Sequence, residues 1–104
     1  MSFIVYVLAD PHDRTRYVGI TKRKLTRRYS EHLRIARLGG SAPVNRWVDG
    51  LLSIGQQPII KLIARSSVRN GREAERIWIG RLVRRGCQLL NVSGQYEVMV
   101  KRRR

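Results

Sequence analysis

Hydrophobic and polar residues follow two different periods along this chain, and these periods predict its secondary structure. Residues 3–9 are almost continuously apolar and rich in β-branched side chains, which is typical of a strand at the centre of a sheet. Polar, turn-forming residues follow at 10–13, and the pattern then predicts a second strand over 16–21. Residues 58–64 repeat the first pattern, so we expect a third strand there.

Three other segments place apolar residues three and four positions apart, which predicts amphipathic helices. We expect these helices over about residues 22–38, 43–54 and 71–85. Pro43 suits a first helical turn, and Asn70 with Glu73 forms a capping-box pattern at the start of the last helix. Gly55 and Gly86 stand where the second and third helices are expected to end.

The order of these elements, strand, strand, helix, helix, strand, helix, predicts an α+β fold. We expect a small, three-stranded, largely antiparallel sheet flanked by the helices. The chain has 104 residues, enough for one domain with one modest core. We assign this domain to residues 1–95 and a C-terminal extension to residues 96–104. Short extended segments are expected at 89–92 and 96–100, and a basic tail at 101–104.

The charge of the chain points to its partner. There are 22 Lys and Arg against 7 Asp and Glu, which gives a formal net charge of +15. Such a charge indicates a polyanionic partner, and nucleic acid is the first candidate. A membrane is not expected. No stretch forms a long basic amphipathic helix, and none has the roughly 18 consecutive apolar residues of a membrane span.

The single cysteine, Cys87, excludes an intrachain disulfide and a cysteine-based zinc site. The apolar run at 3–9 is too short for a secretory signal and lacks its basic leader. We therefore expect a reducing, cytoplasmic location.

Glu75 is the most informative polar residue of the third expected helix. At about 100° per residue it falls inside the apolar sector that contains Ala74, Trp78 and Leu82. A carboxylate that faces a core is costly unless it is paired or binds a metal. Two interpretations are therefore open: a salt bridge to one of the many arginines, or a metal ligand.

Four further residues suggest phosphate chemistry. Tyr6 and Tyr17 stand in two strands joined by a short connection, so their phenols are expected to lie close together. Arg28 and His32 are four residues apart on the first expected helix and point the same way. Arginine can bind phosphate oxygens with two N–H groups, and histidine can relay a proton. Arg27, the residue next to Arg28, is the alternative if the assignment is shifted by one position along the chain.

Two tripeptides, Ile4-Val5-Tyr6 and Tyr17-Val18-Gly19, resemble the two halves of the signature of the GIY-YIG nuclease family, with Ile4 in place of a glycine. The other similarities to the family lie at Thr21, Leu25, Arg28 and His32, at Glu75 ahead of Trp78-Ile79, and at Leu89-Leu90-Asn91. The resemblance extends over about residues 3–94, nearly the whole chain.

This resemblance implies a divalent-metal-dependent endonuclease that hydrolyses phosphodiester bonds in DNA by a one-metal mechanism. It assigns Glu75 to hold one Mg²⁺ or Mn²⁺, a cation that keeps most of its water shell. It implies that a tyrosine is the general base; we choose Tyr6 for this role and Tyr17 for the positioning of the attacking water, and the reverse assignment is the alternative.

The resemblance also implies roles for the remaining polar residues. Arg28 would bind a phosphate oxygen, His32 would assist proton transfer or phosphate binding, and Asn91 would support the site by hydrogen bonding. Further contacts to nucleic acid are expected from Lys22, Arg27, Lys101, Arg102, Arg103 and Arg104.

The substrate and the specificity stay partly open. DNA follows from the resemblance alone, and RNA is an alternative. Many members of the family have a separate recognition domain that this chain lacks, so specificity would come from a protein partner, self-association or the structure of the substrate. A non-catalytic basic nucleic-acid-binding protein is the alternative from another class. A toxin-like nuclease domain of a larger protein is the third possibility.

Overall fold

A computed structural model describes residues 3–67 and 70–91 of the chain. Its elements, in order, are β1 (Phe3–Ala9), β2 (Thr15–Thr21), α1 (Leu25–Arg37), α2 (Pro43–Ser53), β3 (Ile59–Ser66) and α3 (Gly71–Arg84). The predicted α+β fold and the predicted order of elements are confirmed. Among the described helices, none is long and apolar enough to cross a membrane.

The sheet has the strand order β2-β1-β3, and both pairs of strands are antiparallel. β1 is therefore the central strand, as its continuous apolar run predicts. Tyr6 lies opposite Gly19 of β2 and opposite Leu62 of β3. This register pairs the last residue of Ile4-Val5-Tyr6 with the last residue of Tyr17-Val18-Gly19.

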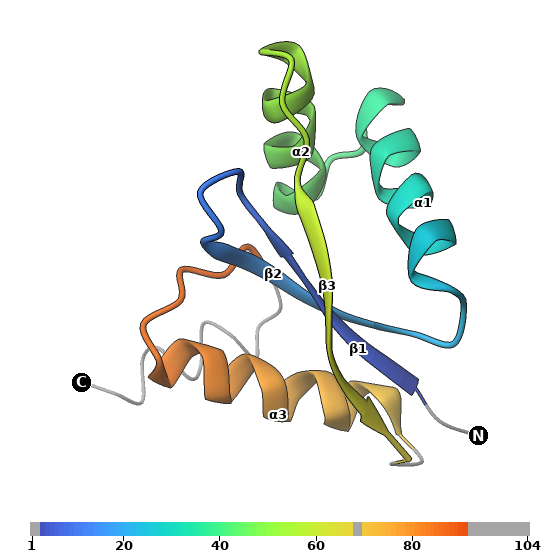
Figure 1. The fold of residues 1–104 in the computed structure, drawn as a ribbon, viewed down its shortest axis with the longest axis vertical. Coiled ribbons are helices and arrows are strands. Elements are labelled where there is room, and N and C mark those ends of the chain that lie inside the picture. The colour runs from blue at the N-terminus through green and yellow to red at the C-terminus, as the bar shows by residue number, and fades with distance from the viewer. Residues whose placement is uncertain (1–2, 68–69, 92–104) are drawn as a thin grey trace.

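Helices lie on both faces of the sheet, α1 and α2 on one and α3 on the other (Figure 1). Each face has its own core. Val5 and Val7 of β1 pack with Ile79 of α3 on one face. Tyr6 and Leu8 point to the other face, toward α1 and α2. Successive residues of a strand point to opposite faces, so the central strand supplies both cores.

The first helix begins three residues later than the sequence pattern predicts, at Leu25. The side chain of Thr21 accepts a hydrogen bond from the backbone N–H of Arg23 at 3.0 Å. This local turn holds residues 21–23 outside the helix, because a threonine hydroxyl competes for the backbone groups that a helix would use.

The third helix begins as its capping pattern predicts. The Asn70 side chain accepts a hydrogen bond from the backbone N–H of Arg72 at 3.0 Å. Gly86 follows the helix with φ of 93°, a left-handed conformation that favours glycine.

The described chain ends at Asn91, alongside the edge strand β2. The backbone N–H of Leu90 donates to the carbonyl of Arg16 at 2.5 Å. The predicted extended segment at 96–100, the extension 96–104 and the basic tail lie outside the described residues.

Candidate active site

The candidate site is built around Tyr6, whose side chain lies across Gly19. A Cβ atom at Gly19 would lie 2.5 Å from the Tyr6 hydroxyl oxygen, closer than any real Cβ contact. A glycine at position 19 therefore leaves room for the Tyr6 side chain, which extends from the central strand across β2. This is why the tripeptide Tyr17-Val18-Gly19 must end in glycine.

Tyr17 lies two residues before Gly19 and therefore on the same face of β2. Its ring centroid is 6.4 Å from that of Tyr6 and 5.5 Å from that of His32. The two tyrosines are thus close together, as the sequence pattern predicts. The Tyr6 side chain is fully buried, whereas Tyr17 is partly exposed.

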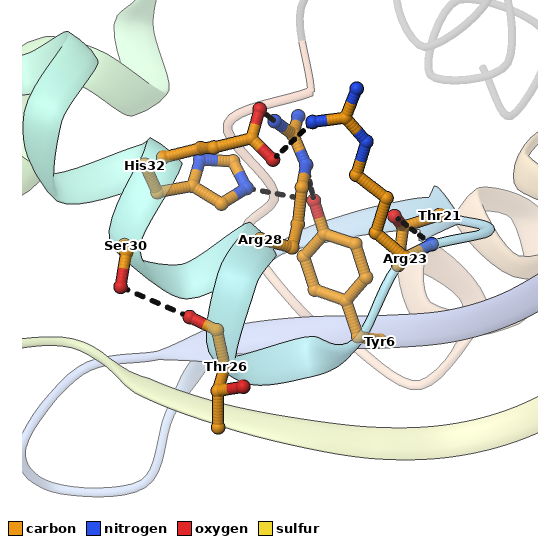
Figure 2. A network of polar contacts seen from close by, with 8 residues as sticks. Tyr6, Thr21, Arg23, Thr26, Arg28, Ser30 and His32 are labelled. Atoms are coloured by element: carbon orange, nitrogen blue, oxygen red, sulfur yellow. Dashed lines mark hydrogen bonds and ion pairs between the residues drawn. The ribbon is translucent and has the colours of Figure 1, made fainter.

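Arg28 and His32 converge on the Tyr6 hydroxyl from α1 (Figure 2). The Nε atom of Arg28 donates to this oxygen at 3.0 Å, and His32 Nε2 lies 2.7 Å from it. His32 is buried, with 3% of its surface exposed. Arg27, the competing assignment, is exposed on α1. The structure therefore places Arg28 and not Arg27 against the tyrosines.

Glu31 completes this network, and sequence reasoning did not single it out. Its two carboxylate oxygens lie 3.3 Å from Arg23 Nη1 and 3.7 Å from Arg28 Nη1. Glu31 thus contacts the guanidinium of Arg28 at its Nη1 atom, whereas the phenol contacts its Nε atom. The i, i+3 spacing of Glu31 from Arg28 was a readable signal. It was hidden because the chain has so many arginines.

Glu75 approaches the same site from α3, on the opposite side of the sheet from α1. It is half-buried, and burial raises the pKa of its carboxyl while the charge of Arg72 partly opposes the shift. Burial also raises the pKa of Tyr17, and the charge of Glu75 raises it further, so the two groups are electrostatic neighbours. Among the described residues, no basic group lies within ion-pair distance of Glu75. The salt-bridge interpretation therefore finds no partner in this part of the chain.

Comparisons with protein-family models, with curated proteins and with solved structures each found nothing similar. The chemistry of the site is therefore argued from its own geometry.

Protonation states in the site follow from burial. Desolvation, together with the nearby charge of Arg28, lowers the pKa of His32 from 6.5 to about 4. His32 is therefore neutral at pH 7 and has one ring nitrogen able to accept a proton. Burial raises the pKa of Tyr6, and Arg28 acts against this shift by favouring the phenolate.

Asn91 supports the site without touching the reactive groups. Its amide nitrogen donates to the Val18 carbonyl at 2.7 Å, and its amide oxygen accepts from the Val18 N–H at 2.9 Å. One side chain thus satisfies both backbone groups of a residue on the open edge of β2, which an edge strand otherwise leaves unpaired. Asn91 holds the strand that contains Tyr17 and Gly19.

The remaining predicted residues lie at the periphery or outside the description. Lys22 is exposed, and its ammonium lies 5.0 Å from the centroid of the Phe3 ring. The predicted contacts of residues 101–104 fall outside the described residues.

A metal site built from several protein side chains is not present in the described ranges. These residues include no group of three or more His, Cys, Asp or Glu that could hold an ion. Glu75, a half-buried carboxylate with no ion-pair partner there, instead fits a cation that takes one protein ligand and keeps its waters.

Proposed function

We propose that this chain is a divalent-metal-dependent endonuclease of the GIY-YIG type, which hydrolyses phosphodiester bonds in DNA. The most direct support is the buried Tyr6 hydroxyl, held between Arg28 at 3.0 Å and His32 at 2.7 Å. A strand tyrosine that only packs needs neither a guanidinium nor a neutral imidazole on its oxygen. Both groups help a phenol to act as a base.

In this proposal Glu75 holds one Mg²⁺ or Mn²⁺. The cation, when bound, neutralises charge on the scissile phosphate and stabilises the leaving oxygen. The support for this assignment is the carboxyl itself, which is half-buried and has no ion-pair partner among the described residues.

The proton of the attacking water passes to Tyr6, and the proton of Tyr6 passes to His32. Transfer to His32 requires its Nε2 to be unprotonated, so the ring carries its proton on Nδ1. The low pKa of His32, about 4, keeps the ring neutral at pH 7 but makes it a weak acceptor, so it takes the proton only while Arg28 stabilises the phenolate. Arg28 donates to the Tyr6 oxygen and so favours the phenolate, because a hydrogen bond to a charged form stabilises that form.

Arg28 and Tyr17 act on the substrate. Tyr6 occupies the Nε atom of Arg28 and Glu31 lies against its Nη1 atom, so the Nη2 group binds a phosphate oxygen as negative charge develops. Tyr17 is the more exposed phenol and orients the attacking water. Lys22, Arg27 and residues 101–104 bind neighbouring phosphates, which requires only their charge.

The alternative, a non-catalytic nucleic-acid-binding protein, is favoured by the net charge of +15 alone. One experiment separates the two functions. The purified chain is incubated with labelled single-stranded, duplex and flap DNA and with RNA, with Mg²⁺, with Mn²⁺ and with EDTA. We expect metal-dependent cleavage that Glu75→Gln abolishes. Binding without cleavage of any of these substrates would support the alternative.

A further inference from the structure

A second feature of the surface lies at the start of β2, where Arg16 directly precedes Tyr17. It is a cleft of about 590 Å³ between the β1–β2 turn and the segment that follows α3. Residues 13–16 line one side, and residues 85–88 line the other. Its volume is within the usual range of small-ligand sites.

The cleft is positively charged. Arg14, Arg16 and Arg85 line it, against the single carboxylate of Asp13. Asp13 forms an ion pair with Lys61, so its charge is already matched. Among the described residues, no carboxylate lies within ion-pair distance of Arg16 or Arg85.

The cleft is also preorganised. Arg14 Nε donates to the carboxylate of Asp10 at 2.7 Å, and Arg16 Nε donates to the carbonyl of Gln88 at 2.8 Å. Each bond orients one guanidinium through its Nε atom alone, and the carboxylate of Asp10 also offsets the charge of Arg14. The terminal N–H groups have the planar geometry that suits phosphate oxygens.

The position of the cleft connects it with the site. Arg16 directly precedes Tyr17 in β2, at the bulge where the pairing with β1 shifts. The segment after α3 runs from the cleft along β2, where Leu90 contacts Arg16 and Asn91 contacts Val18. A polynucleotide at Tyr17 therefore has a neighbouring cationic site along the same strand of the sheet.

We propose that this cleft binds a backbone phosphate of the nucleic acid close to the scissile one. That the bound polymer is DNA rests on the proposed function. That the cleft binds a phosphate rests on its own arginine side chains. The cleft thereby sets the direction in which the substrate strand leaves the active site.

A pair of neighbouring arginines tests this proposal. Arg85→Gln removes a cleft charge, and Arg84→Gln removes an equal charge from the exposed last turn of α3, outside the cleft. Both changes are made in a Glu75→Gln background, and DNA affinity is measured over a series of salt concentrations. We expect Arg85→Gln to lower the slope of log affinity against log salt by about 0.7–0.9, the value of one phosphate contact, and Arg84→Gln to leave it unchanged. Equal slopes for the two variants would overturn the proposal.

Cys87, the single cysteine, gives an independent test because it lines the cleft. Oligonucleotides with an activated disulfide on one backbone phosphate are offered to the protein. We expect crosslinking to Cys87 only for phosphates within a few nucleotides of the cleavage position, and none in Cys87→Ser. Crosslinking that is independent of position would contradict the proposal. A second outcome would also contradict the proposal. If inorganic phosphate protects Cys87 from thiol reagents and the oligonucleotide does not, the cleft is a site for free phosphate.

The two proposals can fail separately. If the wild-type chain cuts DNA and the Arg85 and Arg84 variants bind alike, the cleft proposal is wrong and the endonuclease proposal stands. If only Arg85→Gln loses a phosphate contact and the wild-type chain never cuts, the cleft proposal stands and the endonuclease proposal is wrong.

Discussion

The two sides of the sheet differ in how their polar groups are paired: those on the α1 side have partners, and Glu75 on the α3 side has no ion-pair partner among the described residues. On the α1 side, the Tyr6 oxygen, His32 and Arg28 satisfy one another within 3.0 Å, and Glu31 holds Arg28 in turn. On the α3 side, Glu75 is half-buried and has no ion-pair partner among the described residues. A satisfied network stabilises the fold by itself, whereas a partly buried, unpaired carboxylate costs stability until a cation arrives.

This difference predicts that a substitution on the α3 side changes activity and stability in opposite directions. We expect Glu75→Gln to give no detectable cleavage and to raise the midpoint of thermal unfolding of the metal-free protein at pH 7. The pKa of Glu75 is raised in the fold, so its ionised form is disfavoured there and the neutral amide is not. Cleavage assays and thermal unfolding with EDTA test both parts. Full activity in the variant would refute the metal assignment.

On the α1 side, function and stability should be lost together. We expect Tyr6→Phe to slow the chemical step at least about 10²-fold, the usual scale for loss of a general base. It should also destabilise the protein, because buried His32 and Arg28 lose their shared partner. DNA affinity should hardly change. Single-turnover cleavage and urea unfolding measure the two effects. A larger loss of rate in Tyr17→Phe would reverse the roles of the two tyrosines.

Arg28 and Arg27 offer a matched comparison on one helix. Each substitution by alanine removes one positive charge, but only Arg28 reaches the Tyr6 oxygen. We expect Arg28→Ala to lower kcat about 10²-fold, as for loss of a donor to a developing charge, and Arg27→Ala to weaken DNA binding only slightly. Equal losses of kcat would show that Arg28 acts through its charge alone.

The buried imidazole predicts a pH dependence of stability. The pKa of His32 is about 4 in the fold and 6.5 ordinarily, so the unfolded chain takes up a proton first as the pH falls. The contribution of His32 is complete above pH 6.5, is lost progressively toward pH 4, and falls by about 2 kcal/mol at pH 5. Glu75 acts in the opposite direction because its pKa is raised.

The measurement therefore uses the Glu75→Gln background, which removes the opposing contribution of Glu75. Urea unfolding at pH 7 and pH 5 is compared with and without His32→Gln. We expect the additional substitution to remove most of the loss. An unchanged loss would mean that His32 is not the group that titrates.

The smallest expected effect belongs to Glu31. Its ion pairs with Arg23 and Arg28 are partly exposed, and such pairs are worth up to about 1 kcal/mol. Glu31→Gln should therefore lower kcat a few-fold through looser positioning of Arg28, with Asp49→Asn on the exposed face of α2 as the control. Cleavage at saturating substrate distinguishes the variants. Equal rates would remove Glu31 from the site.

Local patterns determined the elements of this fold and their order. An apolar run, two helical periods and a capping residue act over a few positions, so the sequence predicted β1, α2 and α3 closely. Boundaries were less accurate where side chains compete for the backbone, as at Thr21, which delays α1 to Leu25. The shared face of Arg28 and His32 follows from helical geometry alone.

Only the tertiary structure decided how these groups meet. The Tyr6 phenol reaches the edge of β2 because Gly19 lies directly opposite it, which depends on the strand register. Glu75 comes from the other layer of the fold, and Asn91 binds Val18 across 73 positions of sequence. The sequence determined which chemical groups are available and on which local faces they lie. The distance between them depends on the packing of layers and on non-local pairing, and no local period encodes either.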